Sequence, residues 1–110
     1  MEITSNLENG VSVVRLAGRF DAQTAGMVDE GLQKAIADGG GHLVLDMSKV
    51  EYISSAGLRV LLSTAKRLTA SAGKLVLCGL QPYVLEVFDV AGFTSIFQIK
   101  PDAAAALNSF

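Results

Sequence analysis

The sequence predicts a single α/β domain with a mixed β-sheet of four to five strands and about four helices. Its 110 residues are enough for one hydrophobic core but not for two, and half of them are apolar. Runs of β-forming residues alternate with segments whose apolar residues recur at helical spacing. The resulting order, β-β-α-β-α-β-α-(β)-α, is typical of a layered α/β domain, here expected to span residues 1–110.

The first third of the chain predicts a β-hairpin followed by a helix. Residues 2–17 form two β-rich runs around Asn9-Gly10, a turn dipeptide suited to positive φ. The segment 18–21 is expected to break the second strand, and Asp21 to cap a helix over residues 21–38. The glycines at 39–41 then end this helix. Its apolar stripe comprises Ala25, Val28, Leu32, Ala35 and Ile36.

The middle of the chain predicts a buried strand, a loop and the clearest helix. The run 43–45 is continuously apolar, as in strands covered on both faces, and it ends at Asp46. Residues 47–53 are interpreted as a connecting loop. The next helix opens at Ser54-Ser55, covers residues 55–72 and is closed by Gly73. Its apolar stripe comprises Leu58, Leu61, Leu62, Ala65, Leu68 and Ala72.

The last third predicts two more strands and two short helices. Residues 74–78 form another buried strand, and Pro82 suits the first turn of a helix that ends at Ala91-Gly92. Residues 97–100 add an edge strand, and Asp102 caps a final helix that ends near Leu107. The residues expected to be buried in the sheet are Leu43, Leu45, Leu75 and Leu77.

Composition excludes several classes of function. The net charge of −2 argues against a nucleic-acid binder. No apolar run of about 18 residues is present, so no membrane insertion is expected. The start Met1-Glu2-Ile3 lacks the basic and apolar stretches of a signal peptide, which predicts a cytoplasmic protein. The single Cys78 stands in an apolar run, which indicates a buried, inert thiol and no metal site.

No motif typical of an enzyme is found. His42 is the only histidine, and its place after a glycine run favours a solvated loop residue. A hydrolase built from Ser55, His42 and Asp46 is disfavoured because no Gly-x-Ser-x-Gly motif is present. The glycine run lacks the Lys-Ser/Thr of a P-loop. Asp46 as a phospho-acceptor would need an acidic pair, where only Asp21 is found. We therefore expect no enzyme activity, catalytic residue, cofactor or metal.

The pair Ser54-Ser55 stands where a serine can carry a regulatory phosphate. Serines at a helix start commonly cap free amides, yet the same amides and the helix dipole also accommodate a phosphate. The segment 52–85 carries four basic residues and no acidic one. A docking face for an acidic partner and a merely solvated face both explain this charge. The helix face comprises Ser55, Ala56, Arg59, Val60, Ser63, Lys66 and Arg67.

These features resemble the STAS domain, the fold shared by anti-sigma factor antagonists and the cytoplasmic tails of sulfate transporters. The stretch 45–58 is similar to the family's strand, loop and Asp-Ser-Ser/Thr-Gly-Leu signature. The stretch 18–25 resembles its Gly-x-Leu/Phe-Asp-x-x-Thr/Ser-Ala segment. Because residues 79–82 and 90–93 also fit, the resemblance covers essentially the whole chain.

The resemblance implies that Ser55 is the phosphoserine of the family. Ser54 stands where the family usually has Asp, and Ala56 where it has Ser or Thr. Asp21 maps beside the phosphoserine, where it helps to position the hydroxyl or a kinase-bound metal. The implied neighbourhood of the phosphosite is Asp21, Thr24, Ser54, Ala56 and Gly57. The implied partner contacts are Phe20, Gln23, Arg59, Val60, Ser63 and Arg67.

The function implied by the resemblance is partner switching. The unphosphorylated antagonist binds an anti-sigma factor that is also a serine kinase; phosphorylation of Ser55 releases it, and a serine phosphatase reverses the change. The free protein is expected to be a monomer. The alternative is a STAS subunit without a phosphorylation cycle, in a signalling complex or a lipid-trafficking ABC transporter.

Overall fold

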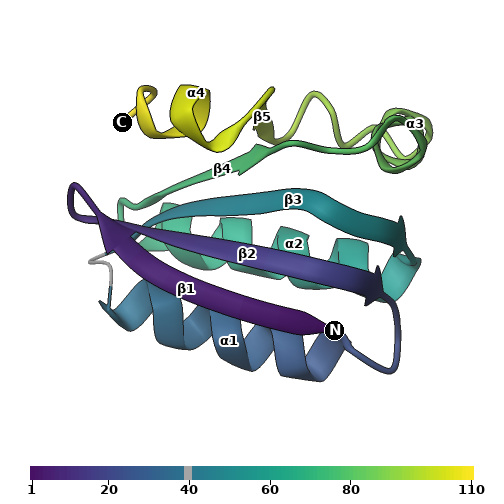
Figure 1. Ribbon diagram of the computed structural model, residues 1–110, viewed down its shortest axis with the longest axis horizontal. Coiled ribbons are helices and arrows are strands. Elements are labelled where there is room, and N and C mark those ends of the chain that lie inside the picture. Colours follow the sequence, from purple (N-terminus) through teal and green to yellow (C-terminus); the bar gives the residue numbers. More distant parts are fainter. Residues whose placement is uncertain (39–40) are drawn as a thin grey trace.

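The computed structural model describes residues 1–38 and 41–110, and it has the predicted α/β order. Five strands lie side by side in chain order (Figure 1). The first two pair antiparallel, and all later neighbours pair parallel, which makes the sheet mixed as predicted. The strands are β1 (Glu2–Glu8), β2 (Val11–Phe20), β3 (His42–Ile53), β4 (Lys74–Cys78) and β5 (Gln98–Lys100).

Four helices are found in the described part of the chain, and they pack on both faces of the sheet. The helices are α1 (Ala25–Asp38), α2 (Ser55–Ala70), α3 (Pro82–Val90) and α4 (Ala103–Leu107). Helices α1 and α2 lie side by side on one face (Figure 1), and α3 contributes Val84 and Phe88 to the same core. On the opposite face, Ala106 of α4 covers Val13, Val44 and Val76.

The segment predicted as a loop at 47–53 belongs to strand β3, and the predicted break at 18–20 belongs to β2. The two segments pair in parallel, with register shifts between Arg15 and Ala17 and between Gly18 and Arg19. Each shift inserts residues that disturb the two-residue alternation of a strand. The buried residues of β3 here are therefore three apart, at Met47, Val50 and Ile53. A search for strict alternation does not detect such a strand.

The ends of the first two helices also differ from the prediction. Helix α1 begins at Ala25, because Asp21 caps a turn that precedes the helix instead of the helix itself. Helix α2 ends at Ala70, and the exposed Ala72 has a positive φ of 59°. The N–H of Gly73 donates to the carbonyl of Leu68 at 2.7 Å, which closes the helix as predicted at this glycine. The predicted end of α1 at Gly39-Gly40 lies outside the described residues.

Most of the expected core is buried. Leu43, Leu45 and Leu77 are inaccessible to solvent, whereas Leu75 is only half-buried against the core. Cys78 is buried as predicted, and burial together with the charge of Asp46 raises the pKa of its thiol from 9.0 to about 12. The thiol therefore stays neutral at physiological pH, consistent with an inert cysteine.

Truncation of the buried Leu61 tests which face of α2 supports the core. Leu61 has no exposed surface, so Leu61→Ala should lower the free energy of unfolding by about 2–5 kcal/mol. Urea denaturation measures this loss. The matched control is Ser63→Ala on the exposed face, which should change stability by less than about 0.5 kcal/mol. A Leu61→Ala protein as stable as this control would contradict the assignment.

Candidate functional site

The candidate site lies where strands β2 and β3 end and helix α2 begins. Both strands run in the same direction, so their carboxyl ends meet at one edge of the sheet, with Phe20 opposite Ile53. The backbone N–H of Ser54 donates to the carbonyl of Phe20 at 3.0 Å. This hydrogen bond holds the start of α2 next to the turn that follows β2.

Gly57 allows the start of α2 to approach the sheet this closely. A Cβ atom at this position would lie 2.8 Å from Cγ1 of Ile53 and 2.9 Å from the carbonyl oxygen of Phe20. Neither atom can move far, because Phe20 and Ile53 are themselves buried. The glycine of the signature is therefore explained by packing: it sets the height of α2, and with it the position of Ser55.

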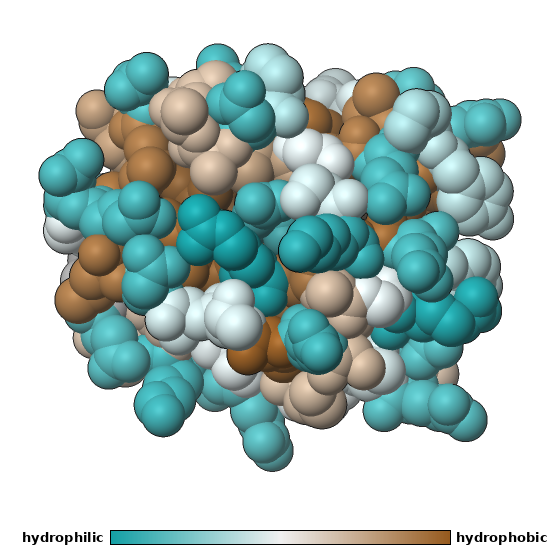
Figure 2. Space-filling view, in the orientation of Figure 1, coloured by the Kyte–Doolittle hydropathy of each residue, from teal (hydrophilic) through white to brown (hydrophobic). Residues whose placement is uncertain are grey.

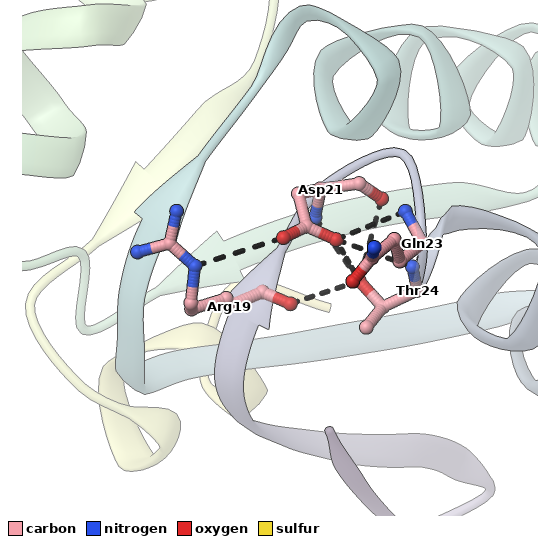
Figure 3. Close-up of polar contacts among 4 residues, drawn as sticks. All are labelled: Arg19, Asp21, Gln23 and Thr24. Atoms are coloured by element: carbon pink, nitrogen blue, oxygen red, sulfur yellow. Dashed lines mark hydrogen bonds and ion pairs between the residues drawn. The ribbon is translucent and has the colours of Figure 1, made fainter.

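The turn after β2 is held by a network of hydrogen bonds (Figure 3). Oδ1 of Asp21 accepts from the backbone N–H of Gln23 at 3.0 Å and of Thr24 at 3.3 Å. The hydroxyl of Thr24 donates to the carbonyl of Arg19 at 2.8 Å, and it accepts from the N–H of Asp21 at 3.0 Å. Asp21 and Thr24 thus fix the shape of this turn.

Arg19 and Tyr52 complete this edge of the site, although no pattern in the sequence predicts a role for either residue. Nε of Arg19 lies 3.6 Å from Oδ2 of Asp21, and its guanidinium lies 4.2 Å from the centre of the Tyr52 ring. The two residues are partners in the β2–β3 register. The two residues pair in the irregular part of β3, where the register is shifted. The sequence alone therefore does not show that they lie next to each other across the two strands.

The two serines at the start of α2 have different environments. Ser55 is the first helical residue and is exposed, whereas Oγ of Ser54 is buried without a hydrogen-bond partner among the described residues. Ser54 is the N-cap residue, yet its side chain does not cap the helix, contrary to the usual role of a serine there. The first turn also contains no acidic residue. The positive end of the α2 dipole is therefore not neutralised by its own helix.

A groove between α1 and α2 begins at Ala56, the residue that follows Ser55. Its lining includes Ala56 and three of the predicted contact residues, Arg59, Val60 and Ser63. Arg67 lies outside the lining, where its Nη1 is 3.8 Å from Oδ1 of Asp29. The lining comprises Ala25, Asp29, Ala56, Arg59, Val60 and Ser63.

Two of the predicted contact residues belong to the opposite side of the site. Gln23 is exposed in the turn that follows β2, at the end of the sheet where α2 begins. Phe20 is fully buried, so its side chain cannot touch a partner. Its role is to support Gly57 from beneath. Phe20 is buried because α2 packs closely against the end of β2. The sequence of the segment 18–21 does not reveal this contact by itself.

The other chemical features of the described chain do not form a second site. His42 and Ser55 lie at opposite ends of the 12-residue strand β3, so the rejected hydrolase triad does not assemble. Within residues 1–38 and 41–110, no group of His, Cys, Asp and Glu side chains could hold a metal ion. No helix described there is long and apolar enough to cross a membrane.

The uncovered part of the sheet is polar. Arg15 donates to Oδ1 of Asn6 at 3.0 Å and lies between the carboxylates of Glu8 and Asp46, at 3.8 and 3.7 Å. Figure 2 shows hydrophilic side chains gathered across the middle of this view, over β1 and β2. Arg15 is thus paired with acidic residues around it, whereas Arg59 and Lys66 of α2 form no ion pair among the described residues.

Comparison with known proteins identifies the family. The sequence profile of the STAS domain matches residues 2–106, and the chain belongs to the STAS domain family. It is 39% identical over 110 residues to BtrV of Bordetella bronchiseptica, provisionally named an anti-sigma factor antagonist, covering 100% of this chain and 95% of that protein. It is 30% identical over 112 residues to the anti-sigma F factor antagonist of Paenibacillus polymyxa, covering 98% and 93% of the two chains.

A solved structure supports the same fold. The Bacillus cell fate determinant SpoIIAA in its phosphorylated form superposes with a TM-score of 0.75 at 19% identity, covering 98% of each chain. The resemblance to the STAS domain, and the α/β order predicted with it, are thereby confirmed. The two relatives are named as antagonists of an anti-sigma factor.

Replacing Gly57 tests the packing that positions Ser55. Gly57→Ala should lower the free energy of unfolding by about 1–3 kcal/mol, because its methyl group collides with buried atoms of Phe20 and Ile53. The matched control is Gly26→Ala in α1, where a Cβ meets nothing within 4 Å. That variant should be unchanged or more stable, since alanine favours a helix. Equal denaturation midpoints for Gly57→Ala and the unmodified protein would contradict this account.

Proposed function

We propose that this protein is a cytoplasmic anti-sigma factor antagonist whose activity is switched by phosphorylation of Ser55. In its unmodified form it binds an anti-sigma factor that is also a serine kinase. Phosphorylation by that kinase releases it, and a serine phosphatase restores binding. The observation that carries this proposal is the exposed Ser55 at the first position of a 16-residue helix whose first turn holds no acidic residue.

The start of α2 is suited to a phosphate on electrostatic grounds. The first amides of a helix have no partners within the helix, and here neither the side chain of Ser54 nor an acidic residue occupies them. A phosphate on Ser55 would add nearly two negative charges at the positive end of the dipole. The modification is therefore compatible with the folded state.

The environment of the two serines favours Ser55 over Ser54 as the acceptor. A kinase must reach the hydroxyl oxygen, and Oγ of Ser54 is buried whereas Ser55 is exposed. Ala56, which replaces a Ser or Thr of the signature, leaves no third hydroxyl. The rigid turn of Asp21 and Thr24 would help to orient the kinase at this edge of the sheet.

Release would follow from the cost of burying a charge. The groove beside Ser55 is lined by the small or apolar Ala25, Ala56 and Val60, with Arg59 at its side. A partner seated on this groove and on the adjacent start of α2 would cover Ser55, and a partner surface that fits the neutral hydroxyl would have to bury a phosphate for which it offers no cation. The names of the relatives and the phosphorylated form of a protein with this fold support the proposal.

The decisive test is the site of phosphate transfer. The protein is incubated with its cognate serine kinase and ATP, and phosphopeptides are mapped by mass spectrometry for the unmodified chain, Ser54→Ala and Ser55→Ala. We expect phosphate on Ser55 in the unmodified chain and in Ser54→Ala, and none in Ser55→Ala. Phosphate on Ser54, or on neither serine, would contradict the proposal and favour a STAS subunit without a phosphorylation cycle.

The same variants test release. Ser55→Asp should retain the fold, because Asp suits a helix start, yet lose binding to the kinase. Ser55→Ala, at an exposed first helical position that is not the N-cap, should change stability by less than about 0.5 kcal/mol and retain binding. Calorimetric titration with the kinase distinguishes the two. Equal affinity of Ser55→Asp and Ser55→Ala would show that charge at this position does not control binding.

Charge reversal on α2 tests the docking face. Arg59→Glu should slow association with the kinase by roughly tenfold and reduce the dependence of the on-rate on salt, because charges at an interface rim act mainly on encounter. Stopped-flow or surface-plasmon measurements at several salt concentrations give the rates. The control is Lys34→Glu, exposed on α1 and outside the groove, with the same change of net charge. Indistinguishable on-rates for the two variants would identify the basic face as merely solvated.

A further inference from the structure

Helix α3 is apolar on both its buried and its exposed sides. Val84 and Phe88 are buried in the core, yet Tyr83 and Val90 on the other side are 54% and 85% exposed. Large apolar side chains that gather on an exposed surface mark a site of interaction. In Figure 1, α3 lies at the margin of the molecule, near the carboxyl end of β3, and none of the other helices described in residues 1–38 and 41–110 covers its outer side.

The exposed side of α3 also carries charge of one sign. Glu86 and Asp89 are exposed, and the helix contains no basic residue. At 100° per residue, Tyr83, Val87 and Val90 form a ridge that the two acidic residues flank on one side. We call this surface the α3 face: Tyr83, Glu86, Val87, Asp89 and Val90.

The outer surface of α2 on the same chain is its complement. Arg59, Lys66 and Arg67 are exposed, Arg67 is paired with Asp29 of α1, and α2 itself contains no acidic residue. The half-buried Val60 and the small Ser63 line the groove to α1 on the same side of the helix. We call this surface the α2 face: Arg59, Val60, Ser63, Lys66 and Arg67.

From these two surfaces we infer that the α3 face of one copy of this protein docks on the α2 face of a second copy. The apolar ridge of Tyr83, Val87 and Val90 enters the groove beside Val60, and Glu86 and Asp89 lie opposite Arg59 and Lys66. Like charges would oppose each other if α3 met α3 or α2 met α2. The contact therefore joins two different surfaces of the chain.

The form of this contact has two consequences. A contact between different surfaces leaves one free face at each end, so it either closes into a ring or extends into a chain. Helix α3 has nine residues and offers a small area, which makes the contact weak and reversible. The expected free monomer then exists only at low protein concentration.

The inference goes beyond the proposed function and does not depend on phosphorylation. It implies that a second copy of this protein and any other partner of the α2 face cannot bind there at the same time. The experiment below uses the purified protein without kinase or ATP. Its failure would leave the assignment of Ser55 untouched, and failure of the phosphorylation test would leave self-association untouched.

Sedimentation velocity over a concentration series, up to about 1 mM, tests the contact. The unmodified protein should shift to higher sedimentation coefficients with concentration and lose this shift in high salt. Two double variants are compared: Glu86→Lys with Asp89→Lys, and Arg59→Glu with Lys66→Glu. Each alone should remain monomeric, because its two faces then carry the same sign. Circular dichroism verifies that both are folded.

Mixing the two variants provides the critical observation. In the mixture each altered face meets a face of opposite charge on the other variant, so association should return although neither variant associates alone. The control is Glu30→Lys with Asp38→Lys, two exposed residues of α1 with the same change of net charge, which should associate normally.

A monomeric unmodified protein at about 1 mM would overturn the inference and leave the α3 face to a different protein. A mixture that stays monomeric, or a control that dissociates as the α3 variant does, would overturn it too. Association that survives in either double variant alone would show that copies meet through another surface.

Discussion

The structure depends on the contact between the start of α2 and the ends of β2 and β3. The Ser54 N–H binds the carbonyl of Phe20, and Gly57 lets the helix lie where any larger residue would collide with Phe20 and Ile53. Because Phe20 and Ile53 are buried, this contact is part of the core. The position of Ser55 is thereby fixed by packing and does not depend on a flexible loop.

At the start of α2, residues that anchor the helix to the sheet stand next to residues that are exposed to solvent. Ser54 and Gly57 face the protein, whereas Ser55 and Arg59 face solvent. A single helical turn thus contains both the anchor and the proposed acceptor. A phosphate at Ser55 would change the charge of the surface while leaving the anchor intact, which is what a switch that acts on binding and not on folding requires.

The charged surfaces of the molecule differ in whether their charges are paired within the chain. On the uncovered face of the sheet, Arg15 lies between Glu8 and Asp46, so this arginine is paired within the chain. Helix α2 is basic and helix α3 is acidic, and most of their charges have no partner within the described chain. The unpaired surfaces are the ones to which we assign partners, one in the proposed function and one in the further inference.

The sequence by itself determined the order of the elements, because helical stripes such as that of α2 and apolar runs such as 43–45 are local patterns. It also indicated Ser55, since a helix start is recognisable from the chain alone. Only the tertiary structure decided that 47–53 is a strand, that Phe20 is buried, and that Arg19 stacks on Tyr52. These features arise from the shifted register of β2 and β3 and from the close approach of α2, and contacts between distant segments leave no periodic trace in the sequence.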